Sequence, residues 1–241
     1  MAATTPQVPS ERSTSFASDV TGMFNFLIDP VGAARCLPHK WFWVAPFLVL
    51  SAAAIFYTAI SGPIGLHYAE TAPLPANVTQ EQYSQQLHIQ AAIQKFMPVI
   101  MPVFLLIFNL IQAGILLASS TMVAVRARFF ELFNLVSGCG IISALQMVAW
   151  AIILMLKHEI SSPGEIRPPL GFDIFLPEGT NKFLFAGIGY FSLFTVWSLV
   201  MMILTYSAGF RVSKSKATFA VLPNFLLGFF FTLVGAAFQK S

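Results

Sequence analysis

The residue types that most often perform catalysis or bind metals are few and scattered in this 241-residue chain. Its four histidines occur singly, without the paired spacing of a zinc site: His39, His67, His88 and His158. Serines such as Ser137, Ser143 and Ser192 lie in apolar segments that contain no histidine or lysine to activate a hydroxyl group. The cysteines Cys36 and Cys139 form no CxxC pair or Cys/His ligand set. We therefore predict a protein without enzymatic activity, metal site or cofactor.

Amides are the notable polar side chains inside the apolar segments, and no Asp, Glu, Lys, Arg or His accompanies them there. They are Asn109, Gln112, Asn134, Gln146 and Asn224. At membrane depth, such amides commonly form hydrogen bonds between helices, worth ~0.6 kcal/mol each. We therefore predict interhelical polar contacts for Asn109, Gln112, Gln146 and Asn224. The alternative is a polar substrate path, which would make the protein a component of a small-molecule or ion permease.

Basic residues gather in the short connections between apolar segments. Arg126 and Arg128 lie in one connection, and Arg211, Lys214 and Lys216 lie in another. The net charge is only +3, and basic residues in loops are typical of membrane topology and anionic headgroups rather than of nucleic-acid binding. We predict that these five residues contact lipid headgroups. The alternative is contact with an acidic cytoplasmic protein partner.

Five apolar segments are each long enough to cross a bilayer, which takes a helix of ~20 residues. They lie at about residues 41–61, 96–118, 132–156, 183–208 and 217–238. The whole chain is 56% hydrophobic and 10% charged, whereas a soluble domain has ~25% charged residues. We predict an all-α integral membrane protein in which residues 39–241 form a five-helix transmembrane bundle.

The region before the first span is predicted to contain a tail and an interfacial segment. Residues 1–14 are polar and are expected to be disordered. Residues 15–38 contain large apolar residues at helical spacing: Phe16, Val20, Phe24 and Leu27. Asp29-Pro30 should end one helix and cap a second. We predict amphipathic helices in the membrane interface, and packing of the same face against the bundle is an equal alternative.

Local signals predict several further helix ends. Gly62-Pro63 is expected to end the first spanning helix. Thr79 and Gln82 fit a capping box, so a polar helix should begin there and continue into the second span. Pro98 and Pro102 predict a kink in that span.

The distribution of charge predicts the orientation. The N-terminal region and the connections after the second and fourth spans carry a net charge of +4, and the opposite side carries −1, in agreement with the total of +3. Because basic residues are enriched in cytoplasmic connections, we expect the N-terminus in the cytoplasm and the C-terminus outside.

Several motifs resemble the bacterial branch of the Yip1-domain family of membrane proteins. Residues 23–30 (MFNFLIDP) and 38–46 (PHKWFWVAP) are similar to the family's amphipathic lead and to the start of its first span. Residues 126–133 (RARFFELF) resemble the segment that starts the third span. Residues 191–197 (FSLFTVW) and 214–217 (KSKA) resemble the aromatic fourth span and the beginning of the fifth. Together these motifs suggest a likeness over most of residues 16–238.

This resemblance implies a five-span fold and a role without catalysis. Eukaryotic members bind Rab GTPases and help to shape or sort membranes of the early secretory pathway, but bacteria have no Rab cycle, so that role does not transfer. Many members have an acid where this chain has Ser192. We expect a scaffold or accessory subunit in a bacterial cytoplasmic (inner) membrane, with a membrane-protein partner or second copies of itself and with no nucleic acid.

Overall fold

A computed structural model describes residues 16–238 except 73–77, 158–159, 161–162 and 178–179. The predicted disordered tail, residues 1–14, lies outside the described residues. Within the described residues the fold is all-α, as predicted, and five helices are long and apolar enough to cross a membrane. These helices are α3 (Val44–Thr71), α4 (Gln80–Met122), α5 (Phe129–Lys157), α7 (Leu193–Phe210) and α8 (Lys214–Phe238). The chain is therefore a multi-pass membrane protein.

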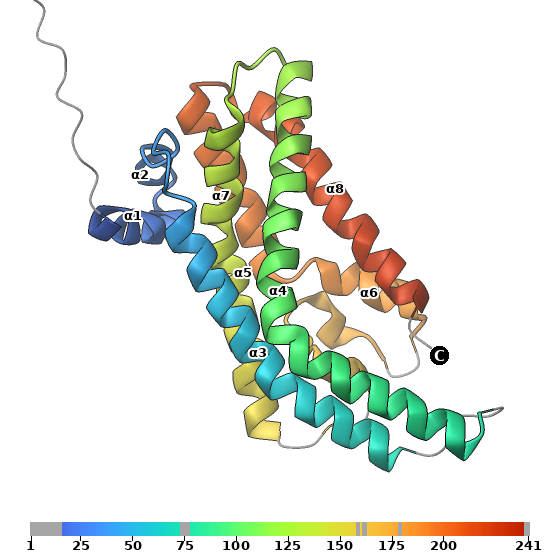
Figure 1. The fold of residues 1–241 in the computed structure, drawn as a ribbon. Coiled ribbons are helices and arrows are strands. Elements are labelled where there is room, and N and C mark those ends of the chain that lie inside the picture. The colour runs from blue at the N-terminus through green and yellow to red at the C-terminus, as the bar shows by residue number, and fades with distance from the viewer. Residues whose placement is uncertain (1–15, 73–77, 158–159, 161–162, 178–179, 239–241) are drawn as a thin grey trace, which may run out of the picture.

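The two central helices of the bundle are α3 and α5, which pack against each other along their length (Figure 1). Their contact is lined by small and branched apolar side chains. Leu50 packs with Ala144 in one cluster, and Tyr57 packs with Ala151 and Leu154 in another. α4 packs against both helices of this pair, α7 packs against α5, and α8 packs against α4 and α7. These three helices leave more of their apolar surface exposed than α3 and α5 do.

The prediction that Gly62-Pro63 ends the first span is wrong, because α3 continues to Thr71 with Pro63 inside the helix. The outer part of α3 lies beside the beginning of α4 (Figure 1). The Tyr83 hydroxyl donates a hydrogen bond to the Ala69 carbonyl, and the Gln94 side chain lies against Gly62. These contacts with α4 offset the backbone hydrogen bond that Pro63 removes.

The start of α4 confirms the predicted capping box. The Gln82 amide donates to Thr79 Oγ1 at 3.3 Å, and the Thr79 amide donates to Gln82 Oε1 at 3.2 Å. From this cap α4 runs without interruption into its membrane-spanning part, with Pro98 and Pro102 inside it. Figure 1 shows α4 bending in the part that contains these prolines.

The predicted fourth span, residues 183–208, is not one helix. It consists of α6 (Lys182–Tyr190) and α7 (Leu193–Phe210), with a break at Phe191-Ser192. The segment before α6 causes this break: Gly171 pairs with Ser192, and the Leu193 amide donates to the Leu170 carbonyl at 3.3 Å. An extended chain that pairs with residues 192–193 takes them out of the helical hydrogen-bond ladder.

That segment also packs against α3 and α5. The Tyr57 hydroxyl donates to the Ile166 carbonyl, and the Trp150 indole N–H donates to the Pro168 carbonyl, each at 2.9 Å. It contains two short 3₁₀ helices, η1 (Pro163–Ile166) and η2 (Phe172–Phe175). The connection after α5 is thus held in place by α3 and α5 before it reaches the break between α6 and α7.

The N-terminal region forms α1 (Phe16–Ile28) and α2 (Pro30–Ala34), and α1 lies across the long helices rather than along them (Figure 1). Asp29 caps α2, as the sequence indicates, because Oδ1 accepts from the amides of Val31 and Gly32 at 3.1 and 2.9 Å. Two members of the predicted apolar stripe on α1, Val20 and Leu27, pack against the main core. Phe24 is 53% exposed, whereas Phe26 is fully buried in the main core.

Candidate functional site

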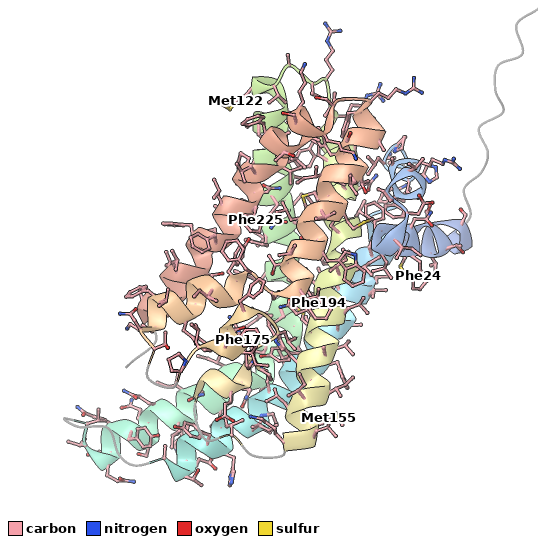
Figure 2. The ribbon with its side chains drawn as sticks, turned by 180° about the vertical axis from the view of Figure 1, so that it is seen from behind. Phe24, Met122, Met155, Phe175, Phe194 and Phe225 are labelled. Carbon is pink, nitrogen blue, oxygen red and sulfur yellow. The ribbon has the colours of Figure 1, made fainter. Side chains whose placement is uncertain are left out.

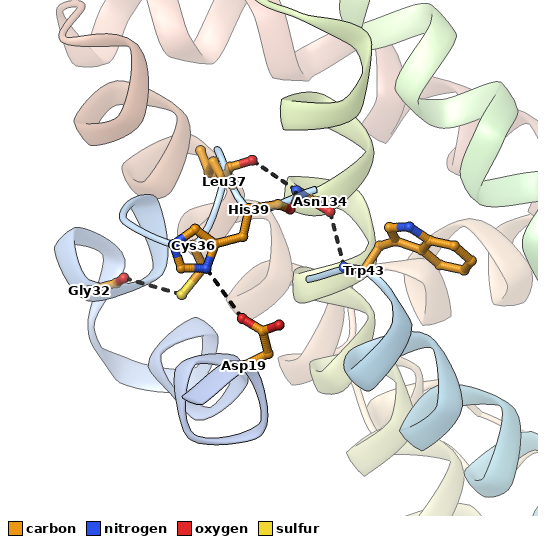
Figure 3. Close-up of polar contacts among 7 residues, drawn as sticks. All are labelled: Asp19, Gly32, Cys36, Leu37, His39, Trp43 and Asn134. Atoms are coloured by element: carbon orange, nitrogen blue, oxygen red, sulfur yellow. Dashed lines mark hydrogen bonds and ion pairs between the residues drawn. The ribbon is translucent and has the colours of Figure 1, made fainter. Parts of the chain in front are cut away.

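The junction between the N-terminal helices and the bundle is organised by Asn134, a fully buried amide on α5 (Figure 3). Its Nδ2 donates to the carbonyls of Leu37 and His39 at 2.8 and 2.7 Å, and its Oδ1 accepts from the Trp43 amide at 3.1 Å. Asn134 therefore satisfies three backbone groups in the segment that joins α2 to α3. Its contacts are with this irregular segment, because a helical backbone has few free groups to offer a side chain.

A second polar contact crosses the same junction. Asp19, which is 7% exposed on α1, lies with Oδ1 3.2 Å from His39 Nδ1 (Figure 3). Cys36 is also buried here, and its Sγ donates to the Gly32 carbonyl at 3.7 Å. Burial, and secondarily the Asp19 carboxylate, raises the pKa of the Cys36 thiol to about 11. The thiol is therefore protonated at neutral pH, and the geometry favours a structural role over a reactive one.

Two further contacts hold α1 against the bundle. The Trp197 indole N–H on α7 donates to the Leu27 carbonyl at 2.8 Å. Gly138 on α5 has no side chain where the Phe26 ring lies, since a Cβ there would be 2.5 Å from ring atoms. Gly138 and Phe26 lie more than a hundred residues apart in the chain, so the sequence does not indicate that they pack together.

The predicted interhelical amides have different surroundings. Gln146 on α5 donates from Nε2 to Ser192 Oγ at 3.2 Å, which joins α5 to the break between α6 and α7. Within the described part of the chain, Asn109 Nδ2 and both polar side-chain atoms of Asn224 are buried without a hydrogen-bond partner. Gln112 is half-buried on α4. The structure thus shows an interhelical hydrogen bond for Gln146 among these four residues.

A buried carboxylate from the connection between α5 and α6 lies near the helix break. Asp173 belongs to η2, is 8% exposed, and accepts from the Gly171 amide at 3.0 Å. A Cβ added to Gly189 on α6 would lie 2.9 Å from Asp173 Oδ2. The pairing of Gly171 with Ser192 and the packing of η2 on α6 bring this acid to the fourth span. In the sequence, Asp173 is an acid flanked by apolar residues in FDIF, which does not by itself predict its burial.

Ser192 should contribute measurably to stability, because its Oγ accepts from the Thr195 amide at 3.1 Å and from Gln146. We expect Ser192→Ala to lower the free energy of unfolding by about 1 kcal/mol, which is typical of a lost N-cap. Ser192→Thr keeps the acceptor and should retain most of that stability. Unfolding of the purified protein in mixed detergent micelles measures both variants. An equal loss in the two would contradict a capping role.

The five basic residues proposed as headgroup or partner contacts all lie exposed at one end of the bundle. They are Arg126, Arg128, Arg211, Lys214 and Lys216, and together they are called the basic end below. Figure 2 shows nitrogen-tipped side chains projecting from this end, at which Met122 is labelled. Arg126 and Arg211 line a common cleft, whereas Arg128, Lys214 and Lys216 are not among its lining residues. The structure therefore separates two of the five basic residues from the other three, a distinction that the sequence does not make.

No protein-family model matches this chain, and no curated protein or solved structure matches it. The resemblance to the Yip1-domain family therefore rests on the sequence motifs alone.

Proposed function

We propose that this protein is a non-enzymatic scaffold or accessory subunit of a membrane complex, similar in kind to bacterial Yip1-domain proteins. The observation that carries the proposal is an exposed apolar seam on α4, defined as Ile89, Ile93, Phe96, Ile100, Val103, Ile107 and Leu110. Each of these side chains is at least 40% exposed. Their spacing alternates between four and three residues throughout, which is the pattern of a helix that packs against another helix.

Lipid contact alone accounts for only part of this seam. Ile100 to Leu110 lie in the apolar part of α4, where exposed apolar side chains would face lipid in any case. Ile89 and Ile93 continue the same spacing into the polar beginning of α4, among glutamines and His88. Apolar side chains in register on both parts favour a helical partner from a membrane protein or a second copy of this chain.

Paired variants test the seam directly. The triple variant Ile100→Ala, Val103→Ala, Ile107→Ala removes exposed side chains from the seam. The control variant Val99→Ala, Phe104→Ala, Ile111→Ala removes exposed side chains that flank the seam in the same stretch of α4, each three or four residues from a seam member. In mild detergent, the seam variant should lose the co-purifying polypeptide or the self-association of the wild type, and the control should keep it. Equal behaviour of the two variants would count against the proposal.

A component of a small-molecule or ion permease is the second candidate function, and the helix break favours it. Many transporters bind substrates or ions where a spanning helix is interrupted and its backbone groups are free. Here the interruption at Phe191-Ser192 lies beside the buried Asp173. Solute flux into liposomes that contain the purified protein would support this role if Asp173→Asn abolished it while the protein remained folded.

We further propose that the membrane is a bacterial cytoplasmic membrane, with the basic end on the cytoplasmic side. The charge distribution supports this orientation through the positive-inside rule. A cysteine placed at Glu70 or Leu170 should react with an impermeant thiol reagent added to intact cells, and one at Ser213 should not. The native Cys36 and Cys139 are buried and should contribute little background. Labelling at residue 213 from outside would reverse the proposed orientation.

A further inference from the structure

A cleft of about 290 Å³ lies at the basic end, between elements that are distant in the sequence. One wall comes from the end of α2 and the residues after it, and another comes from the end of α7. The connection from α4 to α5 and the first turn of α5 complete it. Its lining residues are Ala34, Leu37, Pro38, Arg126, Glu131, Gly209, Phe210 and Arg211.

The acids near this cleft already have partners within the protein. Glu131 Oε2, which lines the cleft, accepts from the Arg128 amide at 2.9 Å and so stabilises the start of α5. Asp29 caps α2, and Asp19 faces His39. Among the described residues, neither Arg126 nor Arg211 forms an ion pair. The two guanidinium groups are therefore available to an external anion, with further positive charge nearby from the other residues of the basic end.

The backbone at Arg211 is held in an unusual conformation. Arg211 follows α7 with φ 52° and ψ 45°, a left-handed position that usually belongs to glycine. Its amide donates to the Ser207 carbonyl, and Ser207 Oγ donates to the Val212 carbonyl at 2.7 Å. These bonds fix the turn. They hold the Arg211 backbone at the end of α7, where Arg211 lines the cleft.

Apart from Arg126, Arg211 and Glu131, the residues that line the cleft are apolar or glycine. Leu37 is 3% exposed and lies against Gly209, where a Cβ would be 2.6 Å from Leu37 Cδ1. Phe210 is half-buried beside it. Two cationic groups above apolar side chains, at the end of membrane-spanning helices, match a phosphate at headgroup level with the glycerol backbone below it.

We propose that this cleft binds the phosphate of an anionic phospholipid headgroup through Arg126 and Arg211. Guanidinium groups suit this ligand because their N–H donors can pair with two phosphate oxygens at once. The site does not require the helical partner proposed for α4, so either inference can fail without the other.

The test compares two double variants that remove the same formal charge. Arg126→Gln with Arg211→Gln alters the cleft, and Lys214→Gln with Lys216→Gln alters the basic end outside it. The full chain is purified in detergent, mixed with phosphatidylglycerol, and the bound lipid is measured by native mass spectrometry. We expect the arginine variant to bind the lipid roughly tenfold more weakly or worse, and the lysine variant to resemble the wild type. An equal loss in both variants would overturn the proposal and indicate general charge attraction.

Further arms separate the other outcomes. Arg126→Lys with Arg211→Lys keeps the charge and guards against a folding defect, and we expect it to bind the lipid with intermediate affinity. Glycerol phosphate and inorganic phosphate, added at millimolar concentration, should not displace the lipid. Displacement by either would mean that the cleft takes free phosphate instead. Loss of a co-purifying protein with unchanged lipid binding would assign the cleft to a protein partner and contradict the proposal.

Discussion

Replacing Asn134 with leucine is expected to lower the free energy of unfolding by roughly 3 kcal/mol or more. The substitution leaves the Leu37 carbonyl and the Trp43 amide without a partner, and a buried unsatisfied polar group costs about 1–3 kcal/mol. The His39 carbonyl loses one of its two donors and keeps the Phe42 amide at 3.3 Å. The loss should begin locally, because these three groups join the N-terminal helices to α3. Unfolding in mixed detergent micelles measures the total effect.

Limited proteolysis gives the local readout for the same variant. Arg35 and Lys40 are exposed and flank the segment that Asn134 holds, so trypsin should cleave there faster in Asn134→Leu than in the wild type. Gln112→Leu is the matched control, since it removes a half-buried amide from α4 without removing a hydrogen bond seen among the described residues. The control should change stability by less than about 1 kcal/mol. Similar effects of the two leucine variants would mean that loss of any amide destabilises the bundle.

Gly138→Ala is the second change with a large expected effect. The new methyl group would lie 2.5 Å from two atoms of the Phe26 ring, which is fully buried and stacked on Phe42 at a centroid distance of 5.5 Å. Because neither ring has free space to move into, we expect a loss of about 1–3 kcal/mol or more, as is typical of overpacked cores. α1 should also separate more easily from α5.

Gly114→Ala provides the control for this clash. Gly114 also lies in a long helix, but no atom lies within 4 Å of an added Cβ, so alanine there should be neutral or stabilising by up to about 1 kcal/mol. Phe26→Leu should partly relieve the clash. The double variant Phe26→Leu, Gly138→Ala should therefore lose less free energy of unfolding than the two single variants lose in total. Strict additivity of the two changes would show that Gly138 and Phe26 do not interact.

The number and helical nature of the spanning segments could be predicted because both depend on local composition. A run of about twenty apolar residues must satisfy most of its own backbone hydrogen bonds in lipid, so it is predominantly helical. The same holds for the capping box of Thr79 and Gln82 and for Asp29 before Pro30, whose bonds join residues two or three positions apart. Such features need no information from elsewhere in the chain.

Two predictions were wrong, the end of the first spanning helix at Gly62-Pro63 and an unbroken fourth span. Both concern places where segments distant in the sequence meet. The break before Ser192 depends on pairing with Gly171, and the continuation of α3 through Pro63 depends on its packing against α4. Nothing in residues 183–208 by themselves predicts an interruption, because their apolar composition is continuous. In each case contact with another segment outweighed the local preference.

The same distinction between local and long-range features applies to the candidate sites. The sequence by itself determined that basic residues lie in two connections at one end of the helices, because charge is excluded from the spans by its desolvation cost. It could not separate Arg126 and Arg211 from the other basic residues, or bring Asp173 to the helix break. Only the tertiary structure decided these points, because the walls of the cleft and the surroundings of Asp173 come from segments separated by tens of residues or more.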